Sequence, residues 1–421
     1  MTEKLLQYLW NFKIFSRFDF RDTEGNPIEI LYSGVWNTNA GPDFLDARIR
    51  TGNIILAGPV ELHIRSSDWI FHNHSRDPNY KNIILHVVFQ HDIEIDELIA
   101  SRVPTLELKD YINGNILRTY EKLAAGERFI PCEAVFDAAK VPVCFHEGNI
   151  LKKLEQKAVE FETSLNEHKN NFEAVLFHSL AYSFGLTVNA AVFRQIAESI
   201  DFSIINKIRQ HRVQLEALLF GISGWLEDPQ DEQMHIWKRE FDFLKVKFSI
   251  PGIAVRPKFS RLRPPNFPTV RLSQLACLYH QHQNLFSKII RIRNPEEMSD
   301  LFNKVKASEY WDDRFNFGKI SKIRYPKTVS PEFTELVILN TVLPLKYTYQ
   351  RYRHEEAPDE ILQLYRSLAP EKNIIVDEWK KLGLRAETAL ESQSLIFHYK
   401  NACEEKNCLN CSIGYNLLKE S

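Results

Sequence analysis

The fold of this chain depends first on residues 41–91, which read GPDFLDARIRTGNIILAGPVELHIRSSDWIFHNHSRDPNYKNIILHVVFQH. Three apolar runs in this stretch have the length and composition of β-strands. They cover residues 44–50, 54–64 and 83–90. A Thr-Gly-Asn tripeptide separates the first two runs, and because Gly and Asn tolerate a positive φ, we expect a hairpin there. The stretch therefore predicts a β-sheet built around one hairpin.

Acidic and imidazole side chains lie near the open end of this expected hairpin. Asp43 starts its first strand, while Glu61 and His63, two residues apart late in the second, project from one face. We expect the carboxylates of Asp43 and Glu61 to lie within about 6 Å of each other, close enough to share a metal. The pattern predicts a hard divalent cation at these two acids, with His63 as a ligand or as the group that activates water. In the alternative interpretation Asp43 caps a turn and the histidines pack a polar sheet edge.

Four further histidines occupy the same stretch: His72, His74, His86 and His91. His72 and His74 form a His-x-His pair that could complete the site, either as metal ligands or as donors to a phosphate. They could equally be surface imidazoles in the turn before Asp77. His86 lies inside the apolar run at 83–90, and this position favours a core histidine.

Length and composition describe a folded protein with a sizeable core. The chain has 421 residues, enough for two or three domains, with 44% hydrophobic and 12% aromatic residues. No apolar run approaches the ~20 residues that cross a bilayer, and the N-terminus lacks the pattern of a signal peptide. Six cysteines in a chain of this length do not indicate a secreted disulfide framework. We therefore expect a cytoplasmic protein without a membrane partner.

The hydrophobic period changes from that of strands to that of helices near Glu147. This change predicts an α+β protein, with an N-terminal α/β core containing a mixed sheet and a mostly α-helical remainder. The predicted parts are an α/β domain at 1–130, a linker at 131–146, a helical domain at 147–355 and a helical tail with a cysteine cluster at 356–421.

Residues 243–295, which we call the basic segment, contain no Asp or Glu. They carry ten Lys and Arg, so the segment has a charge of +10 while the rest of the chain has −12. Five aromatic residues are interleaved with these cations: Phe248, Phe259, Phe267, Tyr279 and Phe286. Such a segment can neutralise phosphates and stack bases, so we expect nucleic acid as a partner. Four residues around a rigid Pro-Pro are predicted to bind the anion: Arg261, Arg263, Asn266 and Arg271. The alternative is a solvated face, or one paired with acids from elsewhere.

The C-terminal tail carries the spacing of a metal site. Cys403, Cys408 and Cys411 follow His398, and the last two form a C-x₂-C pair. We predict zinc or an iron-containing centre there. The fourth ligand is left open among His398, Cys132, Cys144 and Cys277, and the alternative is a group of reduced thiols at a helix end.

The order helix, strand, Pro42-Asp43 hairpin, Glu61-Leu62-His63, helix, strand resembles the core of the PD-(D/E)XK phosphodiesterase superfamily, whose fold is that of restriction endonucleases. The resemblance covers about residues 1–110. It implies that the two acids hold Mg²⁺ or Mn²⁺ with help from the carbonyl of Leu62. The chain departs from the motif at His63, where the superfamily has a lysine that orients water and offsets phosphate charge. The superfamily also includes nucleases with three tail cysteines and one remote cysteine around a [4Fe–4S] cluster, which implies the same for this tail.

The chain also resembles, over nearly its full length, the bacterial family defined by domain of unknown function 2851. The shared segments are GPDF-DARI, GPVELHI-SSDW-HNH, ILHVV, FGLTVNA, ALLFGISG, RPPNFPTVRL and the cysteine-bearing tail. This resemblance implies one common design for the chain and no particular chemistry.

Together these features predict a metal-dependent phosphodiesterase, nuclease-like and acting on nucleic acid, with Asp43, Glu61 and His63 as catalytic residues. The rival interpretation is a non-catalytic module that binds nucleic acid or protein and retains a degenerate nuclease core. A third class, a hydrolase of a small phosphorylated molecule, would require a closed pocket in place of an open groove.

Overall fold

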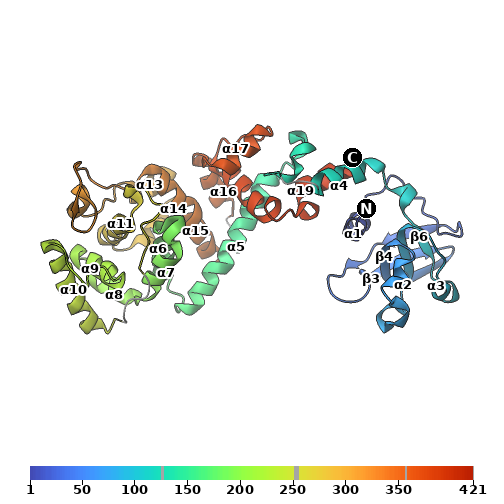
Figure 1. Ribbon diagram of the computed structural model, residues 1–421, viewed down its shortest axis with the longest axis horizontal. Coiled ribbons are helices and arrows are strands. Elements are labelled where there is room, and N and C mark those ends of the chain that lie inside the picture. Colours follow the sequence, from blue (N-terminus) through green and yellow to red (C-terminus); the bar gives the residue numbers. More distant parts are fainter. Residues whose placement is uncertain (125–127, 251–255, 356–357, 421) are drawn as a thin grey trace. The chain divides into compact units, whose positions relative to one another are not determined.

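The computed structural model describes residues 1–124, 128–250, 256–355 and 358–420. The chain divides into two compact units, and neither is a single continuous segment. Unit 1 comprises Met1–Phe145, Asp377–Leu384 and His398–Ser421, and unit 2 comprises His146–Val376 and Arg385–Phe397. A sheet lies in the N-terminal part and helices dominate the remainder (Figure 1), which confirms the predicted α+β class.

Unit 1 is built on a mixed sheet with strand order β1-β3-β4-β5-β6, and β2 also pairs with β3. The strands are β1 (Ile28–Tyr32), β2 (Val35–Trp36), β3 (Phe44–Thr51), β4 (Ile54–Arg65), β5 (Leu85–Gln90) and β6 (Thr105–Glu107). β3 is antiparallel to β1 and β4, whereas β5 is parallel to β4 and β6. The predicted hairpin is confirmed: β3 and β4 are joined through Gly52, whose φ of +57° is the conformation that glycine adopts without strain.

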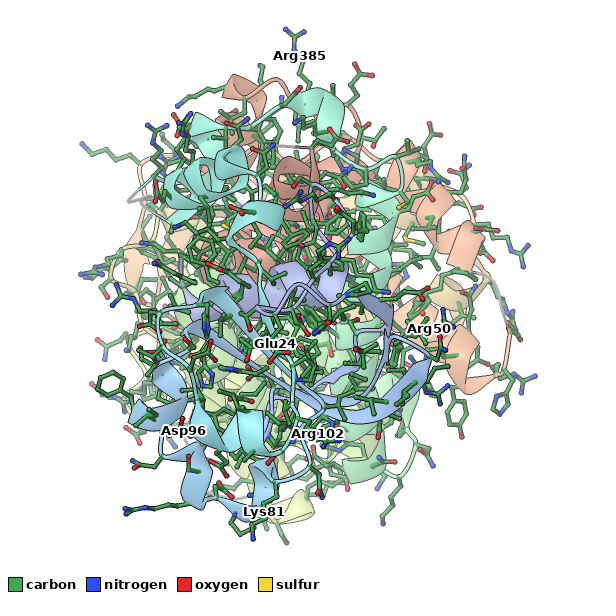
Figure 2. All side chains as sticks on the ribbon, turned by 90° about the vertical axis from the view of Figure 1, so that its right-hand side faces the viewer. Glu24, Arg50, Lys81, Asp96, Arg102 and Arg385 are labelled. Atoms are coloured by element: carbon green, nitrogen blue, oxygen red, sulfur yellow. The ribbon has the colours of Figure 1, made fainter. Side chains whose placement is uncertain are left out.

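Four helices accompany this sheet: α1 (Glu3–Phe12), α2 (Asp68–Phe71), α3 (Asp96–Ala100) and α4 (Gly114–Ala124). Helix α1 begins where the Thr2 hydroxyl accepts a hydrogen bond from the backbone of Leu5, and it buries an apolar face that includes Leu9 and Trp10. The indole of Trp10 donates to the carbonyl of Ser33 at 3.0 Å, which ties the helix to the sheet. Charged side chains such as Arg50, Lys81 and Asp96 are exposed on this unit (Figure 2).

The end of the chain returns to unit 1, so the units differ from the predicted separate tail at 356–421, whose residues 356–357 and 421 lie outside the described residues. Helix α19 (Ser412–Lys419) packs here because it offers apolar and polar contacts to the N-terminal part. The ring of Tyr415 lies 5.3 Å from that of Phe12, and the amide of Asn416 donates to the carbonyl of Lys140 at 2.8 Å. Trp379 of helix α17 (Ile374–Lys381) is fully buried beside Phe136.

Unit 2 is mostly helical and has one large apolar core. Its helices are α5 (Phe145–Glu167, from its second residue on), α6 (Phe172–Phe184), α7 (Leu186–Glu198), α8 (Phe202–Ile208), α9 (Arg212–Ile222), α10 (Glu232–Phe248), α11 (Pro268–Gln281), α12 (Leu285–Arg291), α13 (Pro295–Asn303), α14 (Pro331–Val337), α15 (Leu343–Tyr352), α16 (Pro358–Ser367) and most of α18 (Ala389–His398). Trp237 and Trp311 stack at 6.2 Å inside this core, and Phe220 meets both rings edge-on. Two short strands, β7 (Arg314–Asn316) and β8 (Lys319–Ile320), pair as a small hairpin. None of the described helices is both long and apolar enough to cross a membrane.

Candidate functional site

The hairpin of β3 and β4 places Asp43 beside Glu61. The residues that follow and precede them, Phe44 and Val60, are paired across the two strands. The backbone N–H of Asp43 donates to Oε2 of Glu61 at 3.0 Å, and the N–H of Leu62 donates to Oδ2 of Asp43 at 3.1 Å. Each carboxylate is therefore anchored to the backbone of the opposite strand, and both side chains point to the same place.

Three imidazoles join Glu61 at this place. Nε2 of His74 lies 3.3 Å from Oε1 of Glu61 and 3.2 Å from Nε2 of His63, which itself lies 3.7 Å from the same carboxylate oxygen. His72 completes the group, since the imidazoles of His63, His72 and His74 each offer a nitrogen within 4.8 Å of the others. We call Asp43, Glu61, His63, His72 and His74 the histidine–carboxylate cluster. The structure thus brings five of the predicted site residues together within unit 1.

Burial controls the protonation of the cluster. Glu61 is only 4% exposed and His63 is fully buried, whereas His72 is exposed to solvent. Burial, and then repulsion from Asp43, raises the pKa of Glu61 to about 9. Burial also raises the pKa of Asp43 and lowers the pKa of His74, and it brings that of His63 to about 2. Near neutral pH these shifts favour a protonated Glu61 and neutral imidazoles at His63 and His74.

His86 orients His63 through a contact with Nδ1 of the His63 ring. It is fully buried, as predicted, and its pKa is lowered to about 3, chiefly by burial. Its Nε2 lies 3.0 Å from Nδ1 of His63, while its own Nδ1 has no hydrogen-bond partner among the described residues. When Nδ1 of His63 donates this hydrogen bond, the lone pair on Nε2 of His63 faces Glu61 and His74. A histidine that ligates a metal is oriented in this way by a partner on its other nitrogen.

Sequence reasoning missed three residues that shape the cluster. Gln7 of α1 donates from Nε2 to Oδ1 of Asp43 at 2.7 Å. The ring of Tyr80 lies 3.8 Å from that of His74, and buried Trp69 meets His74 edge-on at 5.2 Å. Nothing in the local pattern marks Gln7, because one polar residue on an amphipathic helix is usual. The aromatic residues flanking the His-x-His pair were the available signal for Trp69 and Tyr80.

The predicted anion-binding residues lie in unit 2, where Arg271 is buried. Arg271 is 5% exposed, with its guanidinium 3.8 Å above the ring of Phe333. It donates to Oδ1 of Asn266 at 2.6 Å and to Oε1 of Gln274 at 3.1 Å. Helix α11 begins at Pro268 and turns this residue inward, so Arg271 with Asn266 stabilises the fold and does not present a cation to solvent. Arg261 and Arg263 are exposed.

The aromatic residues of the basic segment also differ from the expectation. Tyr279 is buried in the core of unit 2, and Phe248 and Phe286 pack against that core. Phe259 and Phe267 meet edge-on at 5.2 Å. The rings of these aromatic residues are therefore used in packing, and the expectation that bases stack on Tyr279 is wrong.

Acids from outside the basic segment pair with two of its cations, Arg256 with Glu227 and Arg293 with Glu360. Residues 251–255 of the segment lie outside the described residues.

Because Arg271 is buried, its removal should destabilise unit 2. We expect Arg271→Ala to lower the free energy of unfolding by about 2–4 kcal/mol, through a cavity and two amide oxygens without a donor. Arg263→Ala, at an exposed position, should change it by no more than about 0.5 kcal/mol. Urea denaturation of the two variants measures the difference, and equal stability would contradict the structural role of Arg271.

The predicted tail cysteines lie together in unit 1. Cys403, Cys408 and Cys411 line one pocket with Cys132 and His398. Of the other two cysteines, Cys144 is exposed and Cys277 is buried in helix α11 of unit 2.

The fold and these side chains define an α+β protein with a buried cluster of carboxylates and imidazoles in its sheet unit. Comparison with known proteins places it in a family: residues 3–374 match the family described as "Protein of unknown function (DUF2851)", and the chain belongs to that family. No curated protein and no solved structure matches the chain.

Proposed function

We propose that this protein is a metal-dependent phosphodiesterase acting on nucleic acid, with the histidine–carboxylate cluster as its active site. The observation that carries the proposal is the convergence of Glu61, His63 and His74 on one point, with Asp43 hydrogen-bonded alongside. No Lys or Arg in the described part of the chain forms an ion pair with either carboxylate. A cation is the partner that such a donor set lacks.

The donors indicate which cation fits. Two carboxylates and three imidazoles combine the oxygen ligands of Mg²⁺ and Mn²⁺ with nitrogen ligands that Mg²⁺ rarely takes. Of the two ions expected from the sequence, Mn²⁺ is therefore the better match, and Zn²⁺ also suits the imidazoles. When bound, the ion would supply positive charge to a phosphate and acidity to a water.

The roles of individual residues follow from their surroundings. His63 has a pKa of about 2 because it is buried, too low for a general base near neutral pH, so its hydrogen bond to His86 favours the ligand role. A neutral imidazole also cannot replace the permanent charge of the superfamily lysine. His72, at the exposed side of the cluster, is the residue placed to meet an incoming phosphate or water.

The topology of unit 1 lends further support. The order α1, β1, β2, β3 with Asp43 just before it, β4 with Glu61 and His63, α2, β5 contains the order noted for the PD-(D/E)XK core. Nucleic acid as the substrate is supported by exposed cations of the basic segment, among them Lys258, Arg261 and Arg263. The rival interpretation, a non-catalytic binding module, requires neither a bound cation nor cleavage of nucleic acid.

The nucleic-acid part of the proposal has its own test. We expect Lys258→Ala, Arg261→Ala and Arg263→Ala together to flatten the salt dependence of nucleic-acid binding by up to about three phosphate contacts, because each exposed cation releases counterions on binding. A triple alanine variant at exposed Lys152, Lys169 and Lys372 is the matched control and should leave the slope unchanged. Fluorescence anisotropy over a range of salt measures both. If the wild type binds no DNA or RNA at low salt, the substrate is not nucleic acid.

A further inference from the structure

Four of the six cysteines meet in one pocket of unit 1, although 270 residues of sequence separate the first from the next. Cys132 lies in the short 3₁₀-helix Pro131–Ala134, and the other three belong to the returning tail. The pocket wall is completed by Pro131, His398, Ala402 and Gly414. Apart from the backbone, the polar or metal-binding groups of this pocket are four thiols and one imidazole.

The local backbone is shaped around these thiols. Cys403 ends a π-helical turn, Tyr399–Cys403, a rare conformation that occurs often at functional sites. Cys411 caps the N-terminus of α19, where its Sγ accepts the N–H of Gly414 at 3.4 Å. A Cβ atom at Gly414 would lie 2.1 Å from the carbonyl oxygen of Cys408, so this close approach requires glycine. Backbone N–H groups near a sulfur and a helix N-terminus both stabilise a thiolate.

Burial and proximity make these thiols hard to ionise without a cation. Cys132 and Cys403 are each 7% exposed. The pKa of Cys132 is raised to about 12, first by burial and then by the negative charges that Cys411 and Cys408 would carry. That of Cys403 is raised by burial and then by Cys411, Cys132 and Cys408. Cys132, Cys403, Cys408 and Cys411 line one pocket, and this geometry indicates a shared metal ion.

We propose that Cys132, Cys403, Cys408 and Cys411 are the four ligands of a second, thiolate-bound metal centre, with Cys132 as the remote ligand. Four cysteines suit two related occupants, a tetrahedral Zn²⁺ or an iron–sulfur cluster. Nε2 of His398 lies 3.2 Å from Sγ of Cys411, which places it as a hydrogen-bond partner of that sulfur. Zn²⁺ binding would release up to four thiol protons to solvent, and a cluster would be assembled from iron and sulfide supplied by the cell.

This centre would act as a structural clasp that does not depend on the proposed phosphodiesterase activity. It would tie the tail to Cys132 of the 3₁₀-helix Pro131–Ala134. Structural metal sites of this kind contribute directly to the free energy of folding.

The test uses the full-length protein, purified anaerobically without chelator. We expect about one equivalent of zinc, or iron with matching acid-labile sulfide and the visible absorption of a cluster. Cys132→Ser should lose most of this metal, whereas Cys144→Ser, which removes the exposed cysteine of the same unit, should retain it. Wild-type protein containing neither zinc nor iron would overturn the proposal.

Two further measurements keep the test decisive when Cys132→Ser folds poorly. Metal-free wild type is titrated with Co²⁺, whose thiolate charge-transfer intensity reports the number of cysteine ligands, and four are expected. Retention of metal by Cys132→Ser together with its loss in His398→Ala would assign the fourth ligand to His398 and overturn the role of Cys132. Glu61→Gln should keep this metal in full, so failure of the proposed active site and failure of this centre give different results.

Discussion

Glu61→Gln is expected to lower metal-dependent cleavage of nucleic acid by about 10³-fold, and to weaken Mn²⁺ binding at the histidine–carboxylate cluster. Glu61 places one oxygen between His63 and His74 and receives the N–H of Asp43 on the other. Glutamine keeps the size of the side chain and can accept that N–H, but it removes the negative charge. The charge stabilisation that a bound cation gives to a phosphoryl transition state is worth several kcal/mol, and each ~1.4 kcal/mol is tenfold in rate.

The measurement is cleavage of labelled single- and double-stranded DNA and RNA by metal-free protein to which Mn²⁺, Mg²⁺ or Zn²⁺ is returned. Glu97→Gln, at an exposed position on α3 of the same unit, is the matched control and should cleave at the wild-type rate. A cation-dependent rate that survives Glu61→Gln would show that the active site lies elsewhere. Wild-type protein that binds Mn²⁺ and cleaves none of these substrates would favour the non-catalytic alternative.

Without a cation, the sheet of unit 1 should be most stable in a narrow window around pH 6.5, because below it two histidines lose stability faster than Glu61 regains it, and above it only the loss from Glu61 remains. The folded pKa values of His63 and His86, about 2 and about 3, lie below the unfolded value of 6.5, so their contribution is present above pH 6.5 and is lost as pH falls. The folded pKa of Glu61, about 9, lies above its unfolded value of 4.5, so its contribution is lost as pH rises toward 9. Each such group changes stability by at most about 1.4 kcal/mol per pH unit.

Mn²⁺ should widen this window on the alkaline side, because it binds the ionised form of Glu61 and stabilises only the folded state. Hydrogen exchange of strands β3, β4 and β5, measured from pH 5 to 9 with chelator or with Mn²⁺, separates this unit from unit 2. Glu61→Gln, which cannot ionise, is expected to lack the alkaline loss. Protection that is unchanged between pH 6.5 and 9 in chelator would contradict the assigned pKa of Glu61.

The hairpin and its acids could be predicted because the information is local. Alternating apolar residues indicate which side chains share a face of β3 and β4, and the Gly52 turn sets their register as far as Ala47. A register shift between Ala47 and Phe44, which the sequence pattern did not indicate, then pairs Phe44 with Val60 and so brings Asp43 opposite Glu61. The presence of His74 in the same cluster was anticipated from its spacing, but not its contact with Glu61 at 3.3 Å, which depends on how α2 and the following turn fold back.

Other features depend on contacts between distant residues, which spacing does not encode. Arg271 lies in a stretch of sequence that favours phosphate binding. The start of α11 at Pro268, however, directs its side chain toward Phe333, 62 positions later. The basic segment was predicted to form a binding surface because its charge can be counted in the sequence, whereas the burial of Tyr279 cannot be inferred from it. The remote partner of the tail cysteines was one of several candidates, and only the return of the tail to unit 1 favours Cys132 over Cys277.

The discontinuous course of unit 1 has a consequence for its biosynthesis. The ribosome completes the sheet early, but Asp377–Leu384 of this unit emerges only after His146–Val376 of unit 2, and His398–Ser421 only after Arg385–Phe397 of unit 2. At about 5–20 residues per second, the nascent sheet waits tens of seconds with the site for α19 uncovered. A premature stop codon near the end of the coding sequence would therefore damage unit 1 and spare unit 2. Such truncations remove residues that lie some 300 positions after the sheet in the sequence. Selection for an intact sheet therefore also acts on these late residues.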